Sequence, residues 1–279
     1  AGLVPTRHRI SDAAGASAQY IFPFAIINYG TRSIPVNLLQ DDIPGADKEV
    51  ILNNSISLLE YKLADGIQKI KRQTRQVVAF TSGQGELNPL QTASLENDLS
   101  NSYAVNRINL DSIVQIPSEI KVLIIAKPTE EFSEAHLFML DQYIMNGGHV
   151  MFLIDPLIVS LDSINQNKSY IPPPYNLGLD PLLFKLGARV NPNLVLDLQC
   201  TRIPMVVGMQ GDKPQTELFP WYYHALISST SDHPITKGLD RIQLEFPGSI
   251  DTIQTASPIM KTILMKSSEY SRIQLTPVR

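Results

Sequence analysis

The sequence has a single cysteine, Cys200, among its 279 residues. One thiol cannot form an internal disulfide, and a zinc site built from several cysteines is excluded. No apolar run reaches about 18 residues, the length typical of a membrane-spanning helix. The first residues, AGLVP, lack the basic region and apolar core of a signal peptide and do not begin with Met. We therefore expect either a protein without an anchor or, as we favour, a fragment of a longer protein.

Long blocks of one charge are missing as well. The 27 acidic and 23 basic residues are scattered along the chain and give a formal net charge of -4. Proteins that bind nucleic acid need a basic face that displaces counterions from the phosphates. A nucleic-acid partner is therefore not expected.

The motifs of several enzyme classes are absent. No two of the five histidines stand at the HExxH spacing of a zinc site. The run Gly83-Gln84-Gly85 lacks the third glycine of a dinucleotide fingerprint and the GK[ST] ending of a P-loop. Leu198 and Arg202 flank Cys200 where a nucleophile elbow needs small residues. We predict no catalytic residue, metal or cofactor, and a partly buried structural thiol at Cys200.

With 43% hydrophobic residues, the chain can bury an α/β core together with a smaller appendage. Residues 1–19 are small and polar and predict a loop. Two β-rich runs, 20–29 and 33–39, predict a hairpin, and helical spacing of apolar residues predicts a helix over 48–70. A basic connector then precedes a new apolar strand. We expect residues 1–74 to form this hairpin-plus-helix appendage and residues 75–279 the main domain.

The main domain begins with apolar runs separated by amphipathic stretches. This alternation predicts a parallel sheet with helices on both faces. The expected strands are 77–81, 104–109, 122–126 and 150–154, and the expected helices are 89–100 and 133–145. Ser133 is placed to cap the second helix, and Gly147 is placed to end it. The predicted fold class is a three-layer α/β domain with a mostly parallel sheet.

The rest of the main domain has a weaker pattern. The proline-rich stretch 156–174 predicts a long surface loop. The segment Phe219-Pro220-Trp221-Tyr222-Tyr223-His224 predicts core packing, which we favour, or an exposed contact patch. The remaining expected elements are a helix at 180–186, a strand at 194–198 and β-rich pieces near 203–207, 242–246 and 261–265.

Ligands of parallel α/β sheets bind beyond the carboxyl ends of the strands. The residues expected there form a candidate crevice for a ligand or partner: Gly83, Gln84, Gly85, Glu86, Lys127, Thr129 and Asp155. The simpler interpretation of the two glycines is a tight strand-to-helix turn with positive φ. Glu86, Lys127 and Asp155 could converge for acid/base chemistry or metal binding, although charged residues at strand ends more often are solvated or act as caps.

Several strings resemble the GldG family of Bacteroidetes, whose members act with an ATPase and a permease in an ABC-type assembly. The most distinctive is LDQYIMNGG, from Leu140 to Gly148. The other main strings are NSI from Asn54, the turn from Gly83 to Leu87, LIIAKPT from Leu123, FSE from Phe132 and DPLLF from Asp180. The chain departs from the family pattern at Gln84, where a Gly-His-Gly-Glu turn would have a histidine, so the turn has no imidazole for chemistry.

The resemblance implies a membrane-anchored protein whose large extracytoplasmic part lies between transmembrane helices outside this sequence. It implies a periplasmic location, anchorage in the inner membrane, and ABC permease and ATPase subunits as partners. It also implies an α/β domain similar to class I glutamine amidotransferases, a flavodoxin-like arrangement, without the catalytic Cys and His. Residues 1–74 would then be the tail of a truncated preceding domain, possibly of thioredoxin type.

Three functions follow from these patterns. The favoured one is a non-catalytic domain of an ABC-transporter accessory protein, linked to gliding motility and secretion, that acts by protein contacts. The second is a hydrolase or amidotransferase-like enzyme that uses the crevice around Glu86, Lys127 and Asp155. The third is a sensor that binds a small ligand or sugar in the same crevice without turnover.

Overall fold

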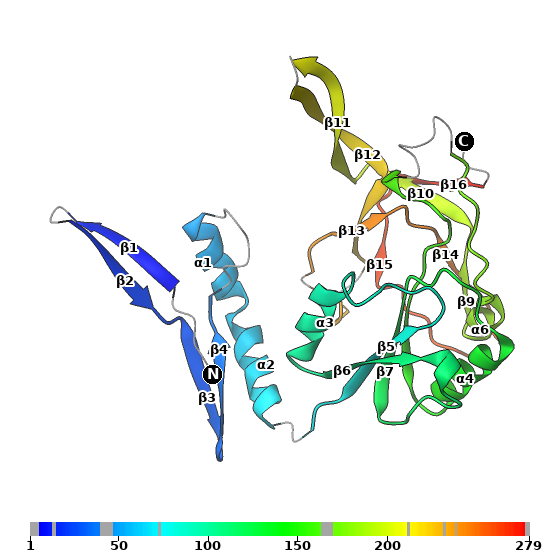
Figure 1. Ribbon diagram of the computed structural model, residues 1–279, viewed down its shortest axis with the longest axis horizontal. Coiled ribbons are helices and arrows are strands. Elements are labelled where there is room, and N and C mark those ends of the chain that lie inside the picture. The colour runs from blue at the N-terminus through cyan, green and yellow to red at the C-terminus, as the bar shows by residue number, and fades with distance from the viewer. Residues whose placement is uncertain are drawn as a thin grey trace. The chain divides into compact units, whose positions relative to one another are not determined.

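The computed structural model describes residues 6–12, 15–39, 47–71, 74–162, 170–210, 213–230, 233–237 and 239–276. The chain divides into two compact units, Ala1–Arg75 and Gln76–Arg279 (Figure 1). None of the helices described is long and apolar enough to cross a membrane.

The first unit contains two β-hairpins and a helical segment. Strands β3 (Phe24–Tyr29) and β4 (Arg32–Asn37) pair antiparallel, as the sequence predicted. The prediction of a loop over residues 1–19 is wrong where the structure describes them, because β1 (Thr6–Asp12) and β2 (Gly15–Ile21) form a second antiparallel pair. Backbone pairing joins these strands, and their small and polar residues lack the apolar alternation by which a strand is recognised in a sequence.

The helix expected over 48–70 is interrupted at Leu58. It forms α1 (Lys48–Ser57) and α2 (Leu59–Lys71), and α2 packs on β3 and β4. Gly66 makes this close packing possible, because a Cβ there would lie 2.7 Å from Ile27 Cδ1 and 2.7 Å from Val36 Cγ2.

The second unit begins with the predicted parallel sheet. Strands β5 (Val77–Ser82), β6 (Ala104–Asn109), β7 (Ile120–Ala126) and β8 (His149–Leu153) pair in parallel in the order β6-β5-β7-β8. The central strands are continuous apolar runs because both of their faces are covered. A short 3-10 helix, η1 (Leu110–Ser112), follows β6.

Alternate residues of β5 and β7 enter different cores. Ala79 and Leu123 are buried in one cluster with residues of α4 (Glu134–Met145) and α6 (Asp180–Lys185). Phe80 is buried on the opposite face, where Leu99 of α3 (Ala93–Ser100) packs against it. The predicted cap of α4 is confirmed, because Ser133 Oγ accepts a hydrogen bond from the His136 backbone nitrogen at 3.3 Å.

From Ala188 onward the described strands pair antiparallel, so the expectation of a mostly parallel sheet over 75–279 is wrong for this part. Antiparallel strands can follow one another through short connections and need no crossover helix. The pairs are β9 (Ala188–Val190) with β14 (Ile250–Thr252), β10 (Asn193–Asp197) with β16 (Ser271–Leu275), β11 (Cys200–Gln210) with β12 (Lys213–Ser229), and β12 with β13 (Ile242–Glu245) and β15 (Met265–Lys266).

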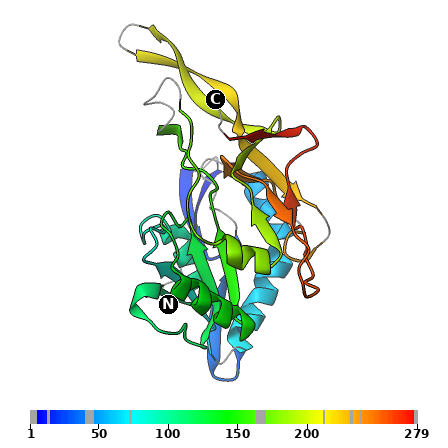
Figure 2. The same cartoon turned by 90° about the vertical axis from the view of Figure 1, so that its right-hand side faces the viewer.

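The outer parts of β11 and β12 extend from this unit as a two-stranded ribbon (Figures 1 and 2). We call residues 203–210 and 213–220 the arm. The sequence predicted only a short β-rich piece here, because prolines and polar residues interrupt the apolar pattern of β12. The aromatic segment lies at the base of the arm. Phe219 and Tyr222 are exposed, whereas His224 is buried, so the expected core packing holds for only part of the segment.

The stretch after β8 also differs from the sequence prediction. Residues 163–169 lie outside the described part, but Leu157 is 1% exposed and forms a β-bridge with Pro174. Leu157 thus anchors the start of this stretch in a core, and the backbone bridge holds Pro174 beside it.

Candidate functional site

The order of the parallel strands reverses between β5 and β7, so the topological switch point lies at the carboxyl ends of these two strands. The turn after β5 and the loop after β7 are hydrogen-bonded to each other there. Gln84 O accepts hydrogen bonds from the backbone nitrogens of Thr129, at 2.9 Å, and Glu130, at 3.0 Å. Thr129 Oγ1 donates to Gly85 O at 3.1 Å. These bonds join the two loops across the switch point.

Both glycines of the turn have positive φ, +115° at Gly83 and +70° at Gly85, which confirms the tight-turn interpretation. A Cβ at Gly85 would collide with Thr129 Oγ1. A Cβ at Gly83 would lie 2.8 Å from side-chain oxygens of Asn109 and Asp111. The glycines therefore allow both the turn and the close approach of its neighbours.

Gln84 and Glu86 face inward in this turn. Gln84 is only 3% exposed. Glu86 Oε2 accepts a hydrogen bond from the Gln84 backbone nitrogen at 2.8 Å, so the carboxylate is held by its own turn. The second oxygen of Glu86 and Oε1 of Gln84 are buried and have no hydrogen-bond partner among the described residues.

Lys127 and Asp155 meet at the ends of the adjacent strands β7 and β8. Lys127 Nζ lies 2.9 Å from Asp155 Oδ2, and this hydrogen bond is the main cause of a raised pKa for the lysine, which burial partly opposes. The lysine therefore carries its charge at neutral pH. The pair lines a hollow of about 720 Å³, which we call the β7–β8 hollow, and Glu86 is not among its lining residues. Of the three charges expected to converge, the structure brings these two together.

The end of β13 and the segment after it form the other wall of this hollow. They contribute Glu245, the last residue of β13, and then Phe246, Pro247 and Gly248. The sequence did not reveal this wall, because it lies about 90 residues after Asp155 in the chain. It also belongs to an antiparallel pair, whereas the rule that places ligands at strand ends applies to parallel sheets.

Cys200 stands at the start of β11, opposite Ala225 of β12. It is partly buried, as predicted, and this burial is the main cause of a raised pKa for the thiol. A raised pKa reduces the thiolate fraction at neutral pH, and the thiolate is the nucleophilic form. These properties are those of a structural thiol.

Comparison with known proteins gives a family. The family ABC_transp_aux, described as an ABC-type uncharacterized transport system, matches residues 75–279. The chain belongs to this transport-system family. No curated protein matches the chain. Among solved structures, it is similar to one titled "mmIFT52 N-terminal domain", with 15% sequence identity, coverage of 70% of this chain and 74% of that chain, and a TM-score of 0.45.

The transport-family domain also contains a polar network that sequence reasoning missed. His136 Nε2 lies 3.0 Å from Asp111 Oδ1, and Gln84 Nε2 lies 3.4 Å from Asp111 Oδ2. The Ser133 backbone nitrogen donates to His136 Nδ1 at 3.4 Å, so Nε2 carries the proton donated to Asp111. The network connects the turn after β5 with the start of α4. Its members are too far apart in sequence to form a recognisable motif.

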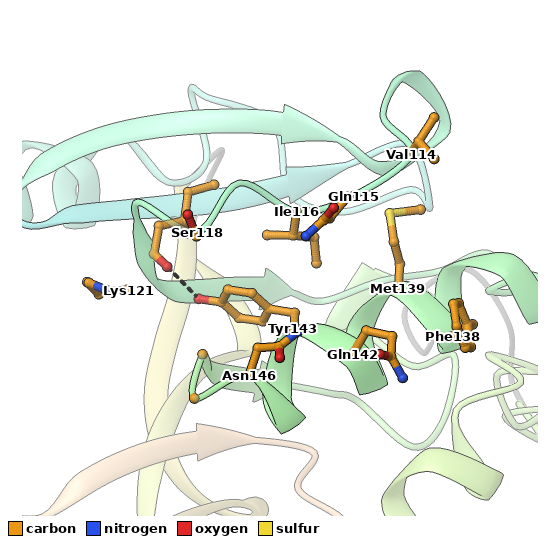
Figure 3. A pocket seen from close by; sticks show the side chains of 13 residues that line it. Val114, Gln115, Ile116, Ser118, Lys121, Phe138, Met139, Gln142, Tyr143 and Asn146 are labelled. Carbon is orange, nitrogen blue, oxygen red and sulfur yellow. Dashed lines mark hydrogen bonds between the residues drawn. The ribbon is translucent and has the colours of Figure 1, made fainter.

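A second hollow of the transport-family domain, of about 570 Å³, lies between α4 and the segment before β7 (Figure 3). Phe138, Met139 and Tyr143 of α4 line it, and Tyr143 Oη donates to Ile120 O at 3.1 Å. Lys121 is the charged residue of its lining, and no carboxylate is among the lining residues. This hollow therefore lacks the paired charges of the β7–β8 hollow.

Proposed function

We propose that this chain is a non-catalytic, extracytoplasmic part of an ABC-transporter accessory protein and that it works through contacts with the other proteins of the transport system. Membership of a transport-system family supports the accessory role. The observation that supports protein contact is the set of exposed apolar side chains on the arm.

Both faces of the arm carry exposed apolar side chains. Residues directly opposite each other in an antiparallel pair lie on the same face. Pro204 pairs with Leu218, and Met205, one position further along β11, pairs with Glu217 and therefore faces the other way. The exposed fractions are 44% for Met205, 63% for Val206, 65% for Met209 and 62% for Leu218. Apolar exposure of this extent on a projecting ribbon is typical of a surface that a partner covers.

The edges of the arm point to side-chain recognition by a folded partner. Pro204 of β11 and Pro214 of β12 have no backbone N–H, so an added strand would find donors missing at both positions. Prolines on exposed edges also oppose uncontrolled strand pairing. A lipid core would leave the free edge groups without hydrogen bonds. We therefore assign the arm to a groove of a protein of the transport system.

The finer parts of this proposal come from the resemblance to the GldG family. They are a role in gliding motility and secretion, a permease and an ATPase as partners, and an inner-membrane anchor in segments beyond this sequence. The strand order β6-β5-β7-β8 matches the first four positions of the flavodoxin-like order 2-1-3-4-5 and supports the proposed amidotransferase-like fold. We also assign residues 1–74 to the tail of a thioredoxin-like domain.

The test is affinity capture of the full-length protein from its own membranes, with permease and ATPase quantified in the eluate. The arm variant combines Val206→Ser, Met209→Ser and Leu218→Ser. The matched control combines Leu90→Ser, Val114→Ser and Met260→Ser, at positions 88%, 97% and 93% exposed. Both sets should change the free energy of unfolding by no more than roughly 0.5 kcal/mol per site, because the side chains are exposed. We expect the arm variant alone to lose both partners; equal recovery by both variants would refute the proposal.

A further inference from the structure

Backbone strain is concentrated at the β7–β8 hollow. Among the described residues, the non-glycine residues with positive φ are Lys127, at 51°, and Phe246, at 52°. Both line this hollow, from opposite walls. Positive φ is unfavourable for side chains such as these and persists only when surrounding contacts enforce it.

Such enforcing contacts are present at both residues. The Lys127 backbone nitrogen donates to Leu153 O at 2.8 Å, and the Phe246 backbone nitrogen donates to Tyr223 O at 2.8 Å. The ring of Phe246 also packs edge-on against His224, with ring centroids 5.3 Å apart. Strained residues held in this way cluster at ligand sites.

The charges of the hollow have an acidic excess. Its charged lining residues are Lys127, Asp155 and Glu245. Lys127 is paired with Asp155, whereas Glu245 has no ion pair within 4 Å in the described part of the chain. A ligand with a positive group would neutralise the excess negative charge. A ligand with a carboxylate would instead meet two carboxylates and a lysine that is already paired.

The remaining surface of the hollow is largely apolar. Leu87, Phe152, Val159, Leu183 and Ile250 contribute to it together with Phe246. The volume of about 720 Å³ lies in the range of small-molecule sites.

We propose that the β7–β8 hollow binds a small amphipathic amine. Its ammonium group lies between Asp155 and Glu245, and its apolar body lies against the apolar wall. Charge-assisted hydrogen bonds to the two carboxylates supply the selectivity for a cation. This binding activity is separate from the proposed contact through the arm, because no arm residue lines the hollow.

Isothermal titration calorimetry on the chain of residues 1–279 tests this proposal with three probes of the same size. They are 3-phenylpropylamine, 3-phenylpropan-1-ol and 3-phenylpropionate, which carry a positive, a neutral and a negative group. We expect the amine to bind at least about fivefold more tightly than the alcohol, and the acid to bind least, because hydrogen bonds between charged groups are the stronger ones. Absence of amine binding at millimolar concentration, or equal affinity for amine and alcohol, would overturn the proposal.

Variants locate the binding. Glu245→Gln should weaken the amine about tenfold, through loss of one charge-assisted hydrogen bond. Glu269→Gln, the same change at an exposed glutamate that does not line the hollow, should leave the affinity unchanged. Asp155→Asn combined with Glu245→Gln leaves Lys127 alone and should reverse the preference, so that the acid binds more tightly than the amine. Thermal unfolding of each variant without probe checks its fold. A Glu245→Gln variant that unfolds at the temperature of the unmodified chain and keeps full amine affinity would contradict the assignment.

Discussion

The backbone nitrogen of Thr129 donates a hydrogen bond to the carbonyl oxygen of Gln84 across 2.9 Å. This bond links the loops after β5 and β7 at the switch point, where a ligand of a parallel sheet usually binds. The charged pair Lys127–Asp155 lies one strand further along, in the β7–β8 hollow. The joined loops therefore act as part of the scaffold, and the open space lies beside them.

Gly85→Ala tests how tightly these loops fit together. A methyl group at Gly85 would meet both the unfavourable φ of +70° and the side chain of Thr129. We expect the free energy of unfolding to fall by about 1–3 kcal/mol. Gly147→Ala is the control, because Gly147 has a φ of +86° but no atom within 4 Å of the added Cβ. Urea unfolding should show the larger loss at Gly85; equal losses would mean that the contact with Thr129 has no energetic weight.

Two positions of α4, Leu140 and Phe138, differ in burial and should differ in their effect on stability. Leu140 is 0% exposed between the sheet and α4, whereas Phe138 is 66% exposed at the rim of the second hollow. Leu140→Ala should lower the free energy of unfolding by about 2–5 kcal/mol through the cavity it leaves. Phe138→Ala should change it by no more than roughly 0.5 kcal/mol. Chemical denaturation measures both, and a large effect at Phe138 would show that its ring is packed.

Acid should destabilise the second unit through His224. Burial lowers the pKa of this imidazole below its ordinary value, and its Nε2 has no hydrogen-bond partner among the described residues. Below the unfolded pKa of about 6.5, the unfolded chain binds a proton that the folded chain does not bind. The contribution of His224 to the free energy of unfolding is therefore fully present above the unfolded pKa. It is lost as the pH falls towards the pKa of the folded state.

Urea unfolding at about pH 7.5 and about pH 5.0 measures this dependence. Between these two pH values, a His224→Leu variant should lose less free energy of unfolding than the unmodified chain. An unchanged pH dependence in the variant would place the titration elsewhere.

Cys200 should react slowly with iodoacetamide at neutral pH. Burial raises the pKa of its thiol, which reduces the reactive thiolate. Because Cys200 is the single cysteine of the sequence, mass spectrometry follows its alkylation without interference. The folded chain should react more slowly than the same chain in urea. Equal rates would show that the thiol is accessible in the folded chain and that its pKa is not raised.

The parallel sheet could be predicted because its central strands are buried on both faces and therefore read as apolar runs. The arm could not be predicted in full, because exposed strands have no core to impose alternation and because Pro220 lies within β12. Three features of the candidate site could not be predicted from the sequence either. The positive φ of Lys127 is set by surrounding contacts, and Glu245 reaches the site from a strand that is distant in the chain. The inward position of Glu86 depends on a hydrogen bond to the backbone of its own turn.

Site-specific photo-crosslinking from the arm tests the central claim most directly. A photoreactive phenylalanine derivative would replace Met209 of the full-length protein in its own membranes, and the same derivative would replace Met260 as the control. Both side chains are exposed, at 65% and 93%. Contact through the arm predicts an adduct with the ABC permease from position 209 and none from position 260. No permease adduct from position 209, or equal adducts from both positions, would contradict it.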